Sequence, residues 1–174
     1  YPYQDLASHA LGFVNADGVG IYGLEKVYNN ILEGTNGRYI TAQNAQSGDM
    51  PFQYETYIED ENGYNLVTTM DTYIQYQLEL VLRNASIESG AQNRATGIVM
   101  NPQNGEIYAM ATYPSFDLNN PYELDELSKN KIDSYDKESA EYKKEYLNLL
   151  FSMWNNKAVT EIYEPGSTFK LVTT

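Results

Sequence analysis

Ser167 and Lys170 are separated by two residues near the end of the sequence, in the run Glu164-Pro165-Gly166-Ser167-Thr168-Phe169-Lys170. On an α-helix, residues three apart lie on one face, with about 5–6 Å between their Cβ atoms. A serine hydroxyl becomes a good nucleophile when a neighbouring base takes its proton, and a lysine is such a base once burial or nearby cations lower its pKa. The pair therefore predicts a serine nucleophile with a lysine base, which is acyl-transfer chemistry.

A helix has to place these two side chains on one face. Pro165-Gly166 predicts its start, because proline does not continue a preceding helix and glycine allows a tight turn. A serine in the first turn lies among free backbone N–H groups at the positive end of the helix dipole. Both features stabilise a developing oxyanion, and Phe169, Leu171 and Val172 supply apolar surroundings.

The spacing alone is weak evidence. Ser128 and Lys131 match it, as do Ser134 and Lys137, in a polar stretch without an apolar face, and we interpret both matches as chance. A serine at a helix N-terminus is also a common cap, with the lysine merely solvated. The surrounding sequence has to decide between these readings.

The first third of the chain has a mixed pattern. Apolar residues at helical spacing predict a helix over residues 24–32, with Gly34 as its C-cap. Residues 37–42 and 52–58 are predicted strands, and residues 60–63 have the composition of a turn. One helix among short strands is typical of an accessory module.

The next segment predicts a helix that leads into a hairpin. After a short strand at residues 65–69, Asp71 or Thr72 is the expected N-cap of a helix that ends near Gly90. Asn104-Gly105 predicts a type I′ hairpin turn. The apolar face expected for the helix consists of Ile74, Leu78, Val81, Leu82 and Ala85.

The last part alternates between loop and helix. Breakers at Tyr113-Pro114 and Asn120-Pro121 predict a loop over residues 113–139. Residues from about 139 to 154 predict a helix, and the whole chain is predicted to be α+β. Its apolar face is formed by Tyr142, Tyr146, Leu149, Leu150 and Met153.

The composition excludes several classes of function. The chain has 174 residues, a net charge of −13 and no cysteine, and no apolar run approaches a membrane span. The negative charge argues against nucleic-acid binding, and the lack of cysteine removes disulfides and thiolate metal sites. His9 is the only histidine, so a Ser–His–Asp triad or a histidine-rich metal site is nearly excluded, and a half-buried polar role is expected for it. We predict neither a metal nor a cofactor.

Several runs resemble motifs of one enzyme family, the penicillin-binding proteins. Residues 164–170 are similar to that family's active-serine motif, Ser-x-x-Lys. Residues 96–119 are similar to its first strand pair and the following loop, and Asn155-Asn156-Lys157-Ala158 resembles its Asn-Arg-Ala element with Lys157 in place of arginine. Thr68-Thr69-Met70-Asp71 followed by Gln75 resembles its Thr-x-Asp-x-x-x-Gln helix start.

The N-terminal residues resemble the non-catalytic module of the class B, high-molecular-weight members, which include the division and sporulation transpeptidases. The motifs follow the family's order over nearly the whole chain. The residues that carry the N-terminal resemblance are Tyr1-Pro2, Gly12, Gly20 and Gly23-Leu24-Glu25.

The resemblance implies a peptidoglycan D,D-transpeptidase that cross-links stem peptides. Ser167 would attack the D-Ala-D-Ala carbonyl, Lys170 would be the base, and β-lactam antibiotics would acylate the same serine. Residues 1–65 would be part of a pedestal or dimerisation module, and residues 66–174 would be the incomplete N-terminal part of a transpeptidase domain. Cell-wall synthesis and division proteins are the implied partners, at the extracytoplasmic face of the bacterial membrane, with an anchoring segment outside these residues.

The family's second and third motifs, Ser-x-Asn and Lys-Thr/Ser-Gly, are expected downstream of residue 174. We therefore interpret the sequence as an N-terminal fragment that ends just after the Ser-x-x-Lys motif and is inactive alone. Two other functions stay open: a protein-interaction pedestal formed by residues 1–65, and a β-lactamase-like or β-lactam-sensing acyl-enzyme. The sequence is compatible with a role in division, elongation or sporulation.

Overall fold

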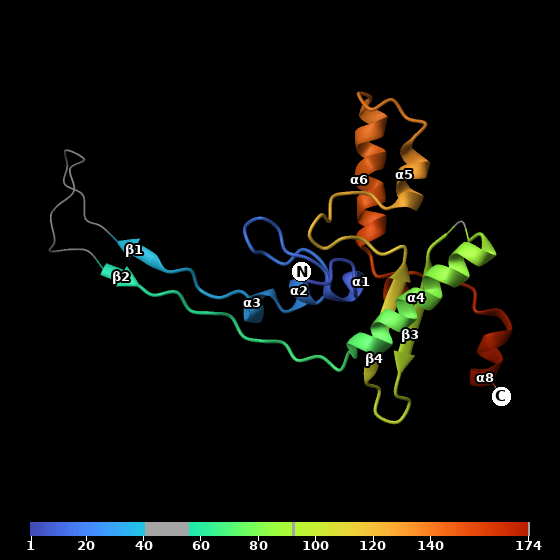
Figure 1. The fold of residues 1–174 in the computed structure, drawn as a ribbon, viewed down its shortest axis with the longest axis horizontal. Coiled ribbons are helices and arrows are strands. Elements are labelled where there is room, and N and C mark those ends of the chain that lie inside the picture. The colour runs from blue at the N-terminus through green and yellow to red at the C-terminus, as the bar shows by residue number, and fades with distance from the viewer. Residues whose placement is uncertain (41–55, 92, 174) are drawn as a thin grey trace.

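The structure is a computed structural model that describes residues 1–40, 56–91 and 93–173. Helix α4, Thr72–Ser89, packs along a hairpin formed by β3, Ala95–Met100, and β4, Ile107–Tyr113 (Figure 1). The predicted N-cap is confirmed at Asp71, whose carboxylate accepts hydrogen bonds from the N–H groups of Tyr73 and Ile74, both at 2.9 Å. Gly90 ends the helix with a φ of 63°, as predicted.

The face that α4 turns to the sheet differs in part from the predicted one. Val81 and Ala85 are exposed, because Gln75 and Ser86 occupy the buried positions. Leu78 packs on Gly97 of β3 so closely that a Cβ on this glycine would lie 2.8 Å from the Leu78 Cδ1 atom. The predicted helix is therefore correct, but polar side chains share its core-facing side.

The hairpin is antiparallel, with Ala95 opposite Tyr113, and its register shifts between Val99 and Met100. Its turn is not the predicted type I′, because Gly105 has a φ of 79° whereas Asn104 does not have a positive φ. A longer loop closes the hairpin instead. The N–H of Asn101 donates to the carbonyl of Glu106, and the N–H of Gly105 donates to the carbonyl of Asn101.

The hydrophobic core lies between helix α6, Ala140–Trp154, and the N-terminal segment, residues 1–32. Ser139 caps α6, and the predicted helix is confirmed. Helix α5, Glu126–Ile132, packs beside α6 and corrects the prediction of a loop over residues 113–139. The buried core side chains are Phe13, Phe116, Leu118, Leu124, Ile132, Leu149, Leu150, Met153 and Trp154.

Short helices form the N-terminal segment: α1, Ser8–Leu11, α2, Gly23–Val27, and α3, Asn29–Leu32. The single helix predicted over residues 24–32 is interrupted at Tyr28, which has a φ of −108° and a ψ of 17°. The Asn29 side chain accepts a hydrogen bond from the N–H of Gly20 at 2.6 Å. A Cβ on Gly20 would lie 2.1 Å from the Glu25 carbonyl oxygen, so this close tertiary approach accompanies the break.

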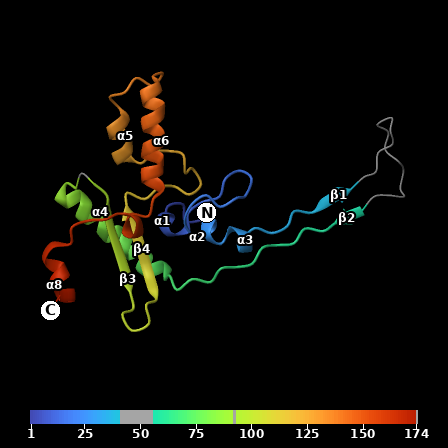
Figure 2. The ribbon, with the colours of Figure 1, turned by 180° about the vertical axis from the view of Figure 1, so that it is seen from behind.

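Strands β1, Arg38–Ile40, and β2, Thr56–Ile58, pair antiparallel in a ribbon that projects from the body (Figures 1 and 2). The remaining residues of the predicted strands, 41–42 and 52–55, lie outside the described residues. Thr35 and Glu61 exchange two backbone hydrogen bonds, so residues 60–63 continue alongside the ribbon rather than forming the predicted turn. Gly34 is not a C-cap; it faces the Glu61 carbonyl, which a Cβ would approach to 2.1 Å. Residues 65–69 do not form the predicted strand.

The predicted α+β class is confirmed by these helices and the two antiparallel strand pairs. Phe13 of the N-terminal segment shares one core with residues 116–154, while the division at residues 65 and 66 stays a prediction. Within the described part of the chain, none of the helices is long and apolar enough to span a membrane.

Candidate active site

Ser167 lies in the short 3₁₀ helix η1, Gly166–Phe169, and Lys170 begins the helix α8, Lys170–Thr173, that follows directly. The helical segment starts at Gly166, which has a φ of 58°, so the predicted start after Pro165 is confirmed. The Thr168 hydroxyl donates to the Pro165 carbonyl at 2.6 Å and fixes the first turn. The candidate nucleophile and base therefore follow each other within one continuous helical segment.

All residues from 159 to 173 are exposed. Ser167 stands at the N-terminal end of its helical segment, where backbone N–H groups have no partner within the helix. An oxyanion formed at this serine would meet such donors. The arrangement suits nucleophilic attack on a carbonyl, but the described residues do not enclose it.

The segment before the nucleophile is attached to the sheet by helix α7, Lys157–Thr160, which packs against β3 and β4. Asn156 caps this helix by accepting from the N–H of Ala158 at 3.2 Å, and its amide nitrogen contacts the Met110 sulfur at 3.0 Å. Lys157 forms an ion pair with Glu161 and donates to the Ser152 hydroxyl at 3.4 Å. The Asn-Asn-Lys-Ala run therefore connects α6 and β4 to the segment that carries Ser167.

Gln75 joins α4 to the outer edge of β4, and only 1% of it is exposed. Its amide nitrogen donates to the Met110 carbonyl at 3.0 Å, and its amide oxygen accepts from the Met110 N–H at 2.9 Å. The Gln75 amide also donates to Glu79, whose carboxylate accepts from the N–H of Ala7. Burial raises the pKa of Glu79. The Thr69 hydroxyl donates to the Ile107 carbonyl at 2.8 Å, so this motif attaches the helix to the strand.

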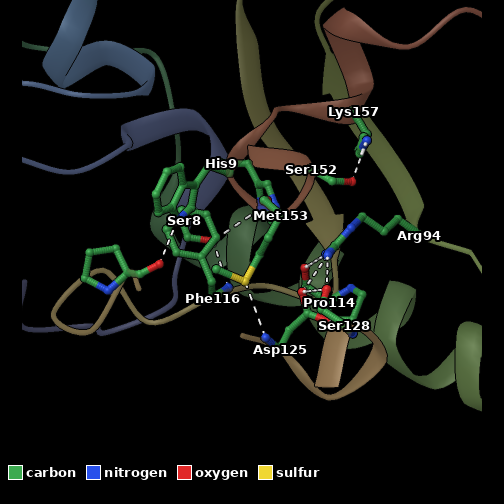
Figure 3. Close-up of polar contacts among 12 residues, drawn as sticks. Ser8, His9, Arg94, Pro114, Phe116, Asp125, Ser128, Ser152, Met153 and Lys157 are labelled. Carbon is green, nitrogen blue, oxygen red and sulfur yellow. Dashed lines mark hydrogen bonds and ion pairs between the residues drawn. The ribbon is translucent and has the colours of Figure 1, made fainter. Parts of the chain in front are cut away.

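His9 is buried, with 5% of its surface exposed, so the predicted half-buried position is wrong. Its Nε2 atom lies 3.0 Å from the Met153 carbonyl oxygen and its Nδ1 atom 3.3 Å from the Ser8 hydroxyl (Figure 3). Burial, reinforced by the charge of Arg94, lowers the pKa of His9 to about 4. The histidine therefore joins the N-terminal segment to the end of α6.

A buried ion pair lies beside this contact. Arg94 and Asp125 are 2.5 Å apart, and their side chains are 11% and 3% exposed. Arg94 also donates to the Ser128 hydroxyl and the Pro114 carbonyl, both at 3.2 Å (Figure 3). Sequence reasoning missed this cluster, although aspartate is a favoured N-cap residue and Asp125 caps α5. Ser128 is not a nucleophile, because it is buried in α5 and bound by this pair.

Two cavities of the described structure lie away from the candidate nucleophile. One, of about 190 Å³, lies between residues 1–11 and residues 68–75. The other, of about 700 Å³, opens between α4, the end of β4 and α5, and neither is lined by Ser167 or Lys170. Among the described residues, no three acidic or histidine side chains gather as metal ligands would.

The sequence and the fold of the chain are both similar to those of known cell-wall enzymes. Residues 95–174 match the family model of the penicillin binding protein transpeptidase domain. The chain is 30% identical over 99% of its length to stage V sporulation protein D from Bacillus subtilis and 32% identical over 98% to the peptidoglycan D,D-transpeptidase FtsI from Buchnera aphidicola. It spans about a quarter of each relative, 23% and 25%. The crystal structure of a peptidoglycan synthetase from Bifidobacterium adolescentis is similar over 98% of the chain and 26% of its own, with 25% identity and a TM-score of 0.67.

Proposed function

Since the chain belongs to the class B penicillin-binding proteins, we propose that the whole protein is a peptidoglycan D,D-transpeptidase that uses Ser167 as its nucleophile. The observation that carries this proposal is the position of Ser167 in the first turn of a helical segment, with Lys170 in the next turn, inside the matched domain. We assign Lys170 the role of base in acylation.

The proposed reaction has two steps. In the first, the Ser167 oxygen attacks the carbonyl of the penultimate D-Ala while Lys170 takes the hydroxyl proton. The peptide bond breaks, the proton passes to the nitrogen of the departing D-Ala, and an ester remains on Ser167. In the second, an acceptor amine attacks this ester, so that a new amide forms and the serine is regenerated.

The Ser167 backbone N–H would stabilise the oxyanion of both tetrahedral intermediates. A β-lactam ring would open by the same attack and leave its acyl group on Ser167. The substrate and inhibitor classes are therefore a stem peptide that ends in D-Ala-D-Ala and the β-lactam antibiotics. Because cross-linking acts on the cell wall, we place the site on the extracytoplasmic face of the bacterial membrane.

A transfer assay on the full-length protein tests the reaction. With a donor peptide ending in D-Ala-D-Ala and an amine acceptor, D-Ala release should match the amount of new amide. Ser167→Ala should lower both by about a thousandfold or more, as expected for loss of a covalent nucleophile. Ser134→Ala removes an exposed serine with the same Ser-x-x-Lys spacing and should leave both unchanged. Equal losses in the two variants would refute the assignment.

The fate of the acyl-enzyme separates this function from the β-lactamase-like or β-lactam-sensing alternative. A transpeptidase holds the β-lactam ester for long periods, whereas a β-lactamase hydrolyses it within seconds. Rapid release of opened β-lactam by the full-length protein, without amide formation, would favour the alternative.

The exposure of residues 159–173 supports a separate proposal for the 174-residue chain alone. Acyl transfer depends on preorganised donors in a site from which water is excluded. We therefore expect the isolated chain to react with a fluorescent penicillin far more slowly than the full-length protein. Labelling of both at the same rate would overturn this expectation.

The ribbon of β1 and β2 favours a second function, a pedestal for cell-wall synthesis or division proteins. It projects from the body (Figure 2). Both of its strands expose apolar side chains. These are Tyr39, Ile40, Tyr57 and Ile58. Replacing Ile40 and Ile58 by serine in the full-length protein should abolish binding of a purified cell-wall synthesis partner and leave penicillin labelling unchanged. Unchanged binding would remove the ribbon from the interface.

A further inference from the structure

The C-terminal end of α6 has an unusual partner. The last carbonyl groups of a helix receive no hydrogen bond from an N–H group of the same helix. A buried carbonyl at this end therefore needs a hydrogen-bond donor from another part of the chain. The Met153 carbonyl is such a group, in a residue with no exposed surface. Its donor is the Nε2 atom of His9 at 3.0 Å, from a residue 144 positions earlier in the chain.

The position of the His9 ring is fixed from several sides. Because the Met153 carbonyl can only accept, Nε2 carries the proton and Nδ1 accepts from the Ser8 hydroxyl at 3.3 Å. The Ser8 oxygen in turn accepts from the Phe116 N–H at 3.4 Å. The imidazole also packs nearly perpendicular to the Phe116 ring, with 5.2 Å between the ring centroids (Figure 3). The donor to Met153 is therefore held in one orientation.

The residues after Met153 continue this attachment toward the nucleophile. The Trp154 indole donates to the Pro121 carbonyl at 2.6 Å, and Asn156 contacts the Met110 sulfur of β4. The Lys157 ammonium group then donates a hydrogen bond back to the Ser152 hydroxyl of α6 at 3.4 Å. The exposed residues 159–173, with Ser167 among them, follow directly. The orientation of this segment depends on how the end of α6 is held.

We propose that His9 is a positioning residue for acylation, which acts through the Met153 carbonyl on the segment that carries Ser167. This inference rests on the proposed function. It assigns the N-terminal segment a part in the reaction, because His9 belongs to α1 and not to the matched transpeptidase residues 95–174. A purely structural His9 would contribute to folding stability but not to the rate at which the folded protein is acylated.

Two substitutions of His9 separate the contacts of its two nitrogens. His9→Gln places an amide nitrogen near the position of Nε2 and can keep the bond to Met153. His9→Asn is shorter, so its amide reaches the position of Nδ1 and leaves the Met153 carbonyl without a donor. Both variants are polar and close in volume, so His9→Gln is the matched control for His9→Asn.

The experiment measures acylation of the full-length protein by a fluorescent penicillin, with the rate at saturation separated from the apparent affinity. We expect His9→Asn to lower the saturating rate by about tenfold or more, as small misplacements of reacting groups do, with little change in affinity. His9→Gln should stay within about threefold of the wild type. The inference is overturned if folded His9→Asn reacts at the wild-type rate, or if both variants slow equally.

Ser8→Ala keeps the inference testable if His9→Asn does not fold. This variant removes the group that orients Nδ1, and we expect it to slow acylation by clearly more than the roughly threefold change allowed for His9→Gln, whereas a wild-type rate would overturn the inference. Labelling of the wild type also tests the proposed function separately. If the wild type does not react at Ser167, the proposed function fails; if it reacts and the variants react equally fast, only the role of His9 fails.

Discussion

Two buried side chains, Gln75 and His9, form hydrogen bonds with backbone groups of another element. Gln75 satisfies both the N–H and the carbonyl of Met110 at the edge of β4. His9 satisfies the Met153 carbonyl at the end of α6. Gln75 connects α4 to β4, and His9 connects α1 to α6. We therefore expect each side chain to contribute more to stability than an ordinary polar group on the surface.

The His9 contact predicts a pH dependence of stability. Its pKa falls from 6.5 to about 4 on folding, chiefly because the ring is buried and also because Arg94 and Lys157 are near. The hydrogen bond to Met153 and the charge of Asp125 act in the opposite direction. Between these values the unfolded chain binds a proton that the folded chain does not, so stability is lost as the pH falls. Between pH 7 and pH 4.5 this one group should lower the free energy of unfolding by about 2–3 kcal/mol.

Urea unfolding of the wild type and His9→Gln at both pH values checks this prediction, because all other groups titrate alike in the two proteins. The stability advantage of the wild type should shrink at pH 4.5 by the amount given above. A difference between the two proteins that is the same at both pH values would contradict a buried, neutral His9.

Gln75→Leu should remove both hydrogen bonds to Met110 and leave two backbone groups without a partner. We expect a loss of about 2–4 kcal/mol in the free energy of unfolding. Hydrogen exchange at the Met110 amide should accelerate in the same variant. Gln77→Leu, at a half-buried position of the same helix, is the control and should change stability by no more than about 0.5 kcal/mol. Equal effects at the two positions would show that the contact to β4 is not the cause.

The sequence identified Ser167 because its motif is local, whereas the role of His9 depends on a partner 144 residues away. Nothing in the neighbourhood of His9 predicts that partner. The Gln75 motif was predicted as a helix start, and Asp71 has that role. The bonds of Gln75 to Met110 become visible only when the helix lies against the strand.

At the scale of elements, long periodic segments were predictable and short ones were not. Helices α4 and α6 are long, have apolar residues at helical spacing and carry capping side chains at Asp71 and Ser139, so local signals predict them. Helix α5 has seven residues and was missed, because its stability comes from contacts with α6 and from Arg94, 31 residues before Asp125. The interruption between α2 and α3 likewise accompanies the close approach of Gly20 to Glu25, which a helical period does not encode.

The buried ion pair of Arg94 and Asp125 is expected to stabilise the fold at the start of α5. Arg94→Met would leave the Asp125 carboxylate buried without its cation, and we expect a loss of about 3 kcal/mol or more. Lys129 and Glu123 form an exposed pair in the same region, so Lys129→Met should leave the stability almost unchanged. Denaturant unfolding measures both, and a cost for Arg94→Met as small as that for Lys129→Met would contradict the burial of this pair.

Over the whole molecule, the N-terminal segment and the helices that precede Ser167 share one core. Phe13 packs against Trp154, with 5.1 Å between the ring centroids, at the point where α6 leads to α7. The nucleophile lies beyond this core, on an exposed segment of the matched domain, and the ribbon of β1 and β2 projects from it (Figure 1). The shared core therefore holds the N-terminal segment against the helix that precedes the segment of Ser167.

The measurement that tests the account most directly is mass spectrometry of the full-length protein after reaction with penicillin. A serine acyl-enzyme adds the whole penicillin to one residue, so we expect a single adduct on the peptide that contains Ser167, and none in Ser167→Ala. Ser134→Ala should carry the same adduct as the wild type. An adduct on another residue, or undiminished labelling of Ser167→Ala, would contradict the assignment of Ser167 as the nucleophile.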